Sequence, residues 1–376
     1  MNRIQIMDCT LRDGGWVNHF RFGDDTMRDI VRTLGRAGIE QIELGYIDEK
    51  DGRTSGHTVW PDFESLNDFI AGTDSPDGPS PLLAAMIDYG KFPAEKIPDR
   101  GSSPLGCIRI CFHRKDLRGA VACGQRVLEA GYALYMQPMV ISRYSEEEFS
   151  ALTEYCCRNL PGMSGFYIVD SFGVMDTAGI TKRILQADRI LADHVILGVH
   201  THNNLRLSFR NAESACQLLR EDGSRRFGGA ELTAPARRLN IDCTLSGIGK
   251  GAGNLATEEF APWLNSHFGT AYRTDLISEL ADRRIRPLRP QYVWGPGPEY
   301  ELTSAYRTTP TYALCWHREH GLPLPLLEQM LKKMPDDKRD SFDADFAQRF
   351  LEAFLAEADR RADASADAPG RIGGIK

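Results

Sequence analysis

The sequence lacks the features of several common protein classes. No apolar run approaches the roughly 18 residues needed to cross a membrane, and the N-terminus has no charged and apolar signal segment. The formal net charge of −7 leaves no basic surplus to neutralise phosphates, which argues against a nucleic-acid partner. The nine cysteines form no C-x-x-C pair and are typical of reduced, buried thiols. We therefore expect a cytoplasmic protein that binds neither membranes nor nucleic acids.

Two histidines separated by one residue are the most informative local feature of the chain. His200 and His202 follow residues 195–199, a short run rich in β-branched side chains that predicts a buried strand. Because side chains alternate along a strand, both imidazoles project to the same side and can share a divalent cation. The alternative is that they are polar residues at the point where a strand enters a loop.

A stretch near the N-terminus supplies complementary groups. Residues 4–15 begin as a strand and end at a Gly-Gly break, with Arg12 and Asp13 just before it. Asp13 offers a hard oxygen ligand, and Arg12 offers a fixed cation that could hold a developing oxyanion. Taken alone, the two residues could be a surface ion pair at a turn. Together with the histidines they favour a functional site, because one segment supplies two nitrogen ligands and the other supplies an oxygen ligand and a cation.

Short apolar runs alternate with amphipathic helical stretches over some 250 residues. We expect a strand around Met7 and further strands at 41–45, 82–87, 107–112, 133–137, 166–170, 195–199 and 241–245. This order fits a (β/α)₈ TIM barrel, with a doubly wound open sheet as the alternative. The barrel is favoured because polar residues cluster at the C-terminal strand ends, where barrel active sites lie: Asp13, Glu43, Gln137, Asp170, Ser171, His200, His202 and Asn254.

After residue 268 the pattern changes to prolines followed by helical stretches. Helices are expected near 311–320, 325–333 and 343–361. We therefore expect a TIM-barrel catalytic domain at 1–270, a small helical C-terminal region at 271–361 and a disordered tail at 362–376. Residues 220–238 are an insertion that is too long for an ordinary helix-to-strand loop.

The last strand runs into a glycine-rich loop at residues 246–258. It is not a phosphate-binding Walker motif, because no G-K-[ST] occurs at the required spacing. By itself the loop could be only a tight turn. Its glycines let the backbone approach a site closely, and Asn254 within it could add an oxygen ligand.

The motifs T-L-R-D-G, H-T-H-N and G-x-G-x-G-A-G-N-x-x-x-E occur here in that order, and the chain resembles the DRE-TIM metallolyase superfamily over about residues 4–265. Members include 3-hydroxy-3-methylglutaryl-CoA lyase, 2-isopropylmalate, citramalate and homocitrate synthases, 4-hydroxy-2-oxovalerate aldolase and the carboxyltransferase domain of pyruvate carboxylase. The resemblance implies that Asp13, His200 and His202 bind a divalent metal. Asn254 would be a further ligand or lie close to it.

The resemblance also implies roles for polar residues around the metal. Arg12 would stabilise an enolate, and Glu43 matches the acidic residue that braces this arginine. Ser171 belongs to a D-[ST]-x-G motif whose hydroxyl lies near the substrate carboxylate, and Gln137 is a further candidate for substrate binding.

One position departs from both branches of the superfamily, and it is the position of the catalytic base in the aldolases. The aldolases place a histidine base three residues after the metal aspartate, and the condensing synthases place a glutamine there, whereas this chain has Trp16. His19 is the nearest substitute base, or else a solvated loop histidine. Tyr306 and Tyr312 are candidate acids, although aromatic residues in an amphipathic helix are more often part of a core.

The expected function is that of a metal-dependent aldolase, a carbon–carbon lyase acting through the enolate of a 2-oxo acid such as pyruvate. An aldehyde or acyl compound would be the second substrate. Mixed nitrogen and oxygen ligation suits Mg²⁺ or Mn²⁺ and also admits Co²⁺ or Zn²⁺. We further expect a homo-oligomer. The alternatives are an acyl-CoA-dependent Claisen condensing synthase and a catalytically silent barrel that serves as a binding or assembly module.

Overall fold

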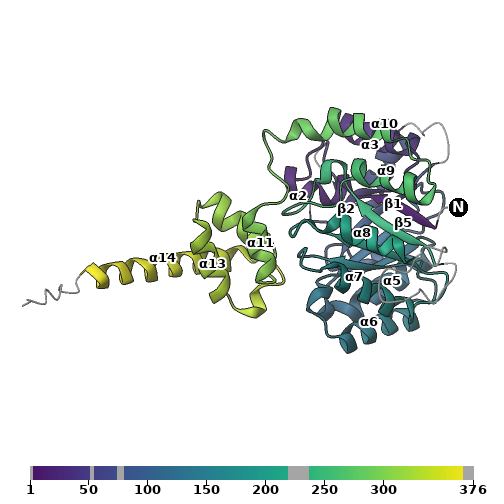
Figure 1. Ribbon diagram of the computed structural model, residues 1–376. Coiled ribbons are helices and arrows are strands. Elements are labelled where there is room, and N and C mark those ends of the chain that lie inside the picture. The colour runs from purple at the N-terminus through teal and green to yellow at the C-terminus, as the bar shows by residue number, and fades with distance from the viewer. Residues whose placement is uncertain (1–2, 51–54, 74–79, 219–236, 367–376) are drawn as a thin grey trace, which may run out of the picture. The chain divides into compact units, whose positions relative to one another are not determined.

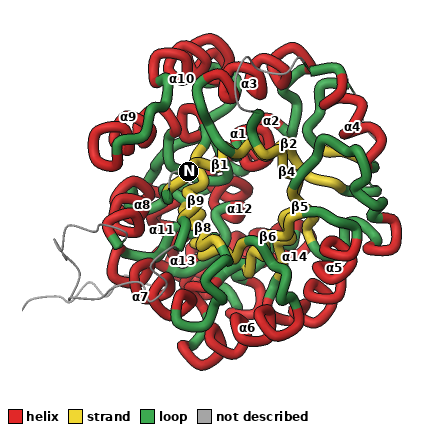
Figure 2. The backbone as a smooth tube through the Cα atoms, turned by 90° about the vertical axis from the view of Figure 1, so that its right-hand side faces the viewer, coloured by secondary structure: helices red, strands yellow, loops and turns green. Residues whose placement is uncertain are grey.

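The computed structural model of the protein describes residues 3–50, 55–73, 80–218 and 237–366. Within them, eight parallel strands form a closed barrel, because β1 pairs with β9 on one side and with β2 on the other. Figure 2 shows the ring of strands surrounded by helices. The predicted (β/α)₈ barrel is confirmed, and the open doubly wound sheet is not formed.

The barrel strands lie close to the predicted positions. They are β1 (Ile4–Asp8), β2 (Gln41–Ile47), β4 (Leu82–Asp88), β5 (Cys107–Phe112), β6 (Ala133–Pro138), β7 (Gly165–Asp170), β8 (Ile196–Thr201) and β9 (Leu239–Cys243). A short strand, β3 (Val59–Trp60), adds to the edge of β2. The last strand begins and ends two residues earlier than expected, and His200 lies inside β8 instead of after it.

The outer helices are α3 (Asp24–Arg36), α4 (Phe63–Ala71), α5 (Leu117–Glu129), α6 (Glu146–Asn159), α7 (Thr177–Asp188), α8 (Ser208–Gln217) and α9 (Thr257–Phe268). Figure 1 shows several of them on the outside of the sheet. The predicted capping box opens α6, where Ser145 accepts from the Glu148 amide and the Glu148 carboxylate accepts from the Ser145 amide. The connection from β4 to β5 carries only a 3₁₀ turn, η1 (Ala94–Lys96).

A polar layer fills the barrel interior towards the N-terminal ends of the strands. Gln41 donates to Gln5 and Asn240, and the Tyr135 hydroxyl donates to Gln41. Tyr167 packs beside them, and a Cβ on Gly198 would lie 2.2 Å from its ring, so only glycine fits there. Side chains fill this end of the barrel. A functional site can therefore lie only at the opposite end, where the strands have their C-terminal ends.

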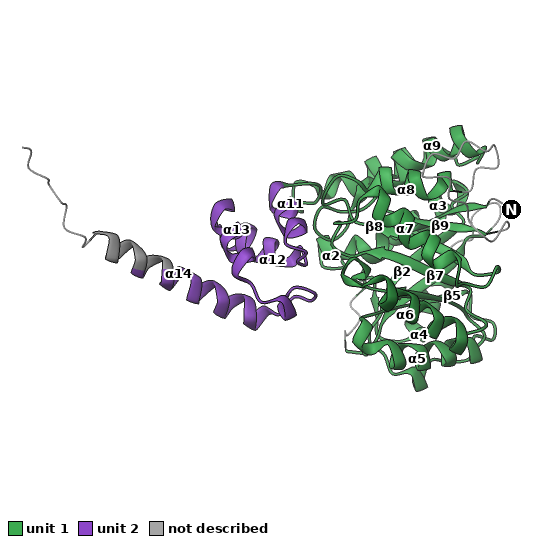
Figure 3. Ribbon diagram, turned by 60° about the horizontal axis from the view of Figure 1, so that its bottom comes forward, with its two compact units in different colours: residues 1–297 green, residues 298–376 purple. Residues whose placement is uncertain are grey.

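The chain forms two compact units, residues 1–297 and 298–376 (Figure 3). The first unit extends beyond the boundary expected after residue 270, because α10 (Thr274–Leu280) packs against α3 and α9. The second unit is helical in its described part, with α11 (Pro298–Ala305), α12 (Thr311–Ala313), α13 (Leu324–Lys333) and α14 (Ala344–Ala366).

Two expectations fall on segments that the structure describes only in part. The insertion at 220–238 lies almost entirely outside the described residues, as does the tail beyond residue 366. Residues 362–366, which we expected in the tail, belong to α14. Among the described helices, none has both the length and the apolar character required to cross a membrane.

Candidate active site

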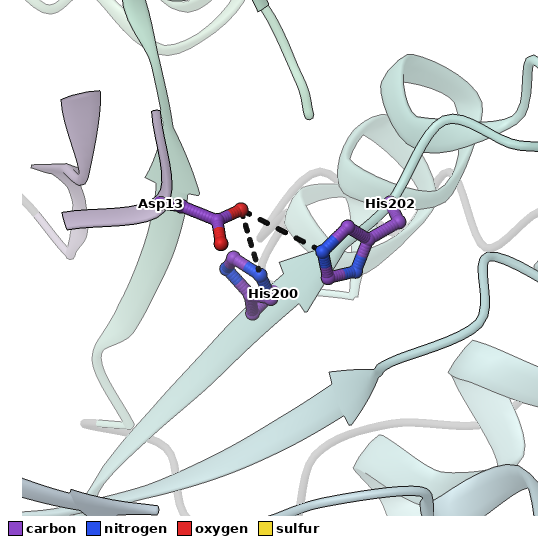
Figure 4. A group of neighbouring side chains, drawn as sticks. All are labelled: Asp13, His200 and His202. Carbon is purple, nitrogen blue, oxygen red and sulfur yellow. Dashed lines mark ion pairs between the residues drawn. The ribbon is translucent and has the colours of Figure 1, made fainter. Parts of the chain in front are cut away.

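The three predicted metal ligands meet at the C-terminal end of the barrel. Asp13 ends the short helix α1 (Thr10–Asp13), which follows β1, while His200 lies in β8 and His202 directly follows that strand. Asp13 Oδ2 lies 3.8 Å from His200 Nε2 and 3.6 Å from His202 Nε2 (Figure 4). All three side chains are buried, and their ligand atoms lie within 4.8 Å of one another. The period-two spacing therefore places both imidazoles on one carboxylate, as the sequence predicted.

Hydrogen bonds on the far side of each ring fix the direction of both imidazoles. His200 Nδ1 lies 3.0 Å from Asp242 Oδ2, and His202 Nδ1 lies 3.0 Å from the backbone oxygen of Asp170. These acceptors favour a proton on Nδ1, which leaves the Nε2 lone pairs facing Asp13. Both Nε2 atoms are thus held in an orientation from which they could bind a cation.

Asn254 completes the set from the glycine-rich loop. Its Nδ2 donates to Asp13 Oδ2, and its backbone bridges to His202. A Cβ on Gly249 would lie 2.1 Å from Asn254 Nδ2 and 2.9 Å from Asp13 Oδ2, so a side chain there would displace both of these residues. Among the described residues, His202 Nε2 and Asn254 Oδ1 are buried and have no hydrogen-bond partner. Buried atoms without partners are uncommon, and here both are lone-pair donors suited to a cation.

The electrostatic surroundings keep the ligands in the form that binds metal. Burial alone would raise the pKa of Asp13, but Arg12 and the two imidazoles outweigh it and hold that pKa well below its usual range. Burial lowers the pKa of His202 to about 4, although Asp13 acts in the opposite direction. At neutral pH the site therefore offers a carboxylate and a neutral imidazole from His202.

Arg12 joins the metal ligands to the acidic residue predicted to brace it. Its Nη1 donates to Asp13 Oδ1 at 2.9 Å, and its Nε donates to Glu43 Oε2 at 2.8 Å. Within the described residues its third nitrogen, Nη2, is buried and has no hydrogen-bond partner. The guanidinium is therefore held rigidly while one donor remains available to a ligand.

Sequence reasoning missed two further members of this network, Arg109 on β5 and Asp242 on β9. Arg109 is fully buried, with Nη1 2.8 Å from Glu43 Oε2 and Nη2 2.5 Å from Asp242 Oδ2. Asp242 also contacts His200, so the chain of contacts closes on itself. This buried circuit consists of Asp13, Arg12, Glu43, Arg109, Asp242 and His200. The available signal was a charged residue inside each of two mainly apolar strands, because such a charge must point into the barrel and find a partner.

The circuit is one positive charge short. It contains three carboxylates, from Asp13, Glu43 and Asp242, but only two guanidinium groups, from Arg12 and Arg109. Burying unbalanced charge is costly, so a bound cation between Asp13 and the imidazoles would complete the compensation. The donor set fits a divalent ion, and the excess of negative charge favours a cation at this position.

The remaining predicted residues lie around this centre in different ways. The Gln137 amide faces Arg109, and in the orientation that satisfies both groups its oxygen accepts from that guanidinium, so Gln137 belongs to the network. Ser171 follows β7 and its hydroxyl accepts from the backbone amide of Val140 at 2.8 Å. His19 is exposed in a left-handed conformation after α2 (Gly15–Asn18), with its ring centroid 6.3 Å from that of Tyr292. The structure records no direct contact between His19 and the three ligands, and its role as the base stays a prediction.

The two candidate acids lie in the second unit. Tyr312 is fully buried there, packs against Trp316 and Phe342, and its hydroxyl accepts from the Asp343 amide. The Tyr306 hydroxyl donates to Glu328. These contacts give both tyrosines a structural role within their own unit, and a catalytic role for either stays a prediction.

This geometry, a barrel with an Asp-His-His centre braced by a buried arginine, defines a class of metal-dependent enzymes, and comparison with known proteins agrees. Residues 113–280 match the HMGL-like family model. The 4-hydroxy-2-oxovalerate aldolase of Geobacillus genomosp. 3 is 27% identical over 76% of this chain and 77% of its own length. The oxaloacetate decarboxylase of Mycobacterium tuberculosis is also 27% identical, over 67% of each chain.

Solved structures show the same fold. The N-terminal domain of a candidate aldolase from Bacteroides vulgatus superposes with a TM-score of 0.68 at 22% identity, covering 83% of this chain and 96% of that domain. The carboxyl transferase domain of Rhizobium etli pyruvate carboxylase superposes with a TM-score of 0.64 at 11% identity, covering 88% of this chain and 55% of that one. The match of residues 113–280 to the HMGL-like family model and the relatives named above agree with the similarity to the DRE-TIM metallolyases that the motifs indicated.

Proposed function

We propose that this protein is a divalent-metal-dependent aldolase, a carbon–carbon lyase that acts on a 2-oxo acid such as pyruvate. The observation that supports this most directly is the convergence of three buried polar atoms without partners in the described structure: His202 Nε2, Asn254 Oδ1 and Arg12 Nη2. Two of them are acceptors suited to a cation, and the third is a donor suited to an oxyanion. A compound that carries a carboxylate next to a keto group presents oxygens to both.

Asp13, His200 and His202 would hold the ion, with Asn254 beside them. A set that combines carboxylate and amide oxygens with imidazole nitrogens suits Mg²⁺ or Mn²⁺, and we propose these two. When bound, the ion supplies Lewis-acid polarisation of the substrate carbonyl.

Arg12 would bind the substrate through Nη2, the nitrogen that contacts neither Glu43 nor Asp13. Glu43 and Asp13 fix two of its nitrogens, so the guanidinium loses little freedom when Nη2 donates to an oxygen. That hydrogen bond strengthens as negative charge develops on the keto oxygen, which stabilises the enolate more than the ground state. Because the site is buried, water competes weakly for this donor.

The experiment measures deuterium exchange at C3 of pyruvate in D₂O by NMR, with Mn²⁺, with Mg²⁺ and after chelation. We expect metal-dependent exchange in the wild type and its loss in Asp13→Asn, together with lowered metal content. Lys115→Met is the control, because Lys115 is exposed in η2 (Arg114–Asp116) after β5 and should leave both unchanged.

Two outcomes would contradict the proposal. One is exchange and metal content that both survive in Asp13→Asn. The other is wild-type protein that binds metal but exchanges no member of a panel of 2-oxo acids. Release of free thiol from acetyl-CoA in the presence of a 2-oxo acid would favour the condensing-synthase alternative instead.

A further inference from the structure

Lys250 lies at the barrel mouth, on the glycine-rich loop four residues before Asn254. It is only partly exposed, and its Nζ lies 5.1 Å from the centroid of the Trp16 ring. Its charge interacts with Asp13, which follows β1, and with Asp88 at the end of β4. Lys250 belongs to the loop after β9, and β4 lies three strands away around the ring. An ammonium group that interacts with the ends of both β1 and β4 therefore lies at the barrel mouth, which a substrate must use.

The Lys250 ammonium has no strong anionic partner. Within the described residues, no hydrogen bond or ion pair of this nitrogen is found, whereas Lys96 pairs with Glu49 at 3.0 Å and Lys91 with Asp48 at 3.9 Å. Burial lowers the pKa of Lys250, while Asp13 and Asp88 act in the opposite direction. A cation that is removed from water without a paired anion is costly to the folded state. Such a group is expected to gain its partner when a ligand binds.

Trp16 gives this part of the mouth an aromatic wall. Trp16 is 49% exposed, which is unusual for a large aromatic side chain, and it packs edge-on against Phe20 and Tyr46. The Tyr46 ring in turn lies 5.9 Å from the Arg12 guanidinium. The aromatic wall therefore extends from the Arg12 guanidinium, which would face the 2-oxo acid, to the Lys250 ammonium on the glycine-rich loop.

We propose that Lys250 binds an oxyanion carried by the second substrate, so that the carbon acceptor is an aldehyde bearing a carboxylate or a phosphate. This inference rests on the aldolase function proposed above. The 2-oxo acid would occupy Arg12 and the metal ligands, and its C3 must face the open mouth for a second carbon to reach it. An acceptor entering there would pass beside Trp16 and Lys250, where its anionic end would pair with the partly exposed ammonium.

The test compares acceptors that differ only in charge. Condensation with pyruvate is measured for succinic semialdehyde against butyraldehyde, and for glyceraldehyde 3-phosphate against glyceraldehyde; the two arms distinguish carboxylate from phosphate. In the wild type we expect kcat/KM for one anionic acceptor to exceed that of its neutral partner at least about tenfold, the effect of one charged hydrogen bond.

Lys250→Met should abolish that preference mainly through a higher KM for the anionic acceptor, and Lys250→Arg should keep part of it. Lys115→Met should preserve it, because that lysine is exposed. A wild-type ratio near one in both arms would overturn the inference, as would an equal loss for charged and neutral acceptors in Lys250→Met.

A binding measurement separates this inference from the proposed function. Succinate and inorganic phosphate are titrated into the Mn²⁺-loaded full-length protein, and tryptophan emission is recorded, since the indole of Trp16 borders the site. We expect a saturable change for one anion that is lost in Lys250→Met. Anion binding without pyruvate exchange would refute the aldolase function and leave the anion site standing. Pyruvate exchange without charge preference or anion binding would refute only the anion site.

Discussion

Replacing Arg109 by methionine removes the central cation of the buried circuit. The methionine fills similar space but leaves Glu43 Oε2 and Asp242 Oδ2 without the guanidinium that now lies 2.8 Å and 2.5 Å away. Breaking a buried pair by deleting one partner costs about 3–5 kcal/mol, because the remaining charge stays desolvated. We therefore expect Arg109→Met to lower the free energy of unfolding of the first unit by that amount.

Arg109→Met should also weaken metal binding. Asp242 orients His200, and without Arg109 its pKa rises, which weakens its hold on Nδ1 of that ring. Disturbing a residue that orients a metal ligand commonly lowers affinity about 10- to 100-fold. Mn²⁺ binding by the folded variant should weaken within this range.

The assay is urea unfolding of the metal-free full-length protein, followed by circular dichroism and tryptophan fluorescence. Because the chain has two units, the two probes must be fitted separately. Arg273→Met is the control, since Arg273 pairs with Asp275 on the surface, where both side chains are more than half exposed. The control should not shift the unfolding midpoint measurably.

A double variant tests the cause of the loss. Arg109→Met combined with Asp242→Asn removes the cation and one of the two stranded charges, so its loss should be smaller than the sum of the single losses. The reasoning would be refuted if Arg109→Met stayed within about 1 kcal/mol of the wild type, the size expected of an exposed pair. Strict additivity in the double variant would refute the charge argument even if the single variant were unstable.

Two further predictions concern the ligands themselves. The folded-state pKa of His202 lies at about 4, below its ordinary value of 6.5, so the unfolded chain takes up a proton first as the pH falls. The stability of metal-free wild type relative to His202→Gln should therefore fall by about 3 kcal/mol between pH 7 and pH 4, and a difference independent of pH would contradict this. Gly249→Ala should lower bound metal measured by elemental analysis, because its Cβ would displace Asn254, whereas Gly162→Ala meets nothing closer than 3.5 Å and should bind metal normally.

The sequence by itself determined the barrel and the three side chains, Asp13, His200 and His202, that meet at its mouth. Alternation of apolar runs with amphipathic helices predicts β/α units, and the length of the repeating region suits a closed ring. The ligand positions were also predictable, because Asp13, His200 and His202 all lie near strand ends and the period of a strand sets which side chains share a face.

The unit boundary was less predictable. The break in the β/α pattern at residue 268 suggested a new domain, yet α10 continues the barrel unit by packing on α3 and α9. Amphipathic periodicity indicates that a helix has an apolar face, but it does not predict which part of the protein covers that face.

Only the tertiary structure decided how the centre is supported. Arg109 and Asp242 are separated by 133 positions in the chain, and their contact exists because the barrel closes with β5 and β9 facing across its interior. The same closure brings Gly249 against Asp13 and leaves Lys250 over the mouth. Local patterns determine which side chains point inward, whereas the register and closure of the whole ring determine which of them meet.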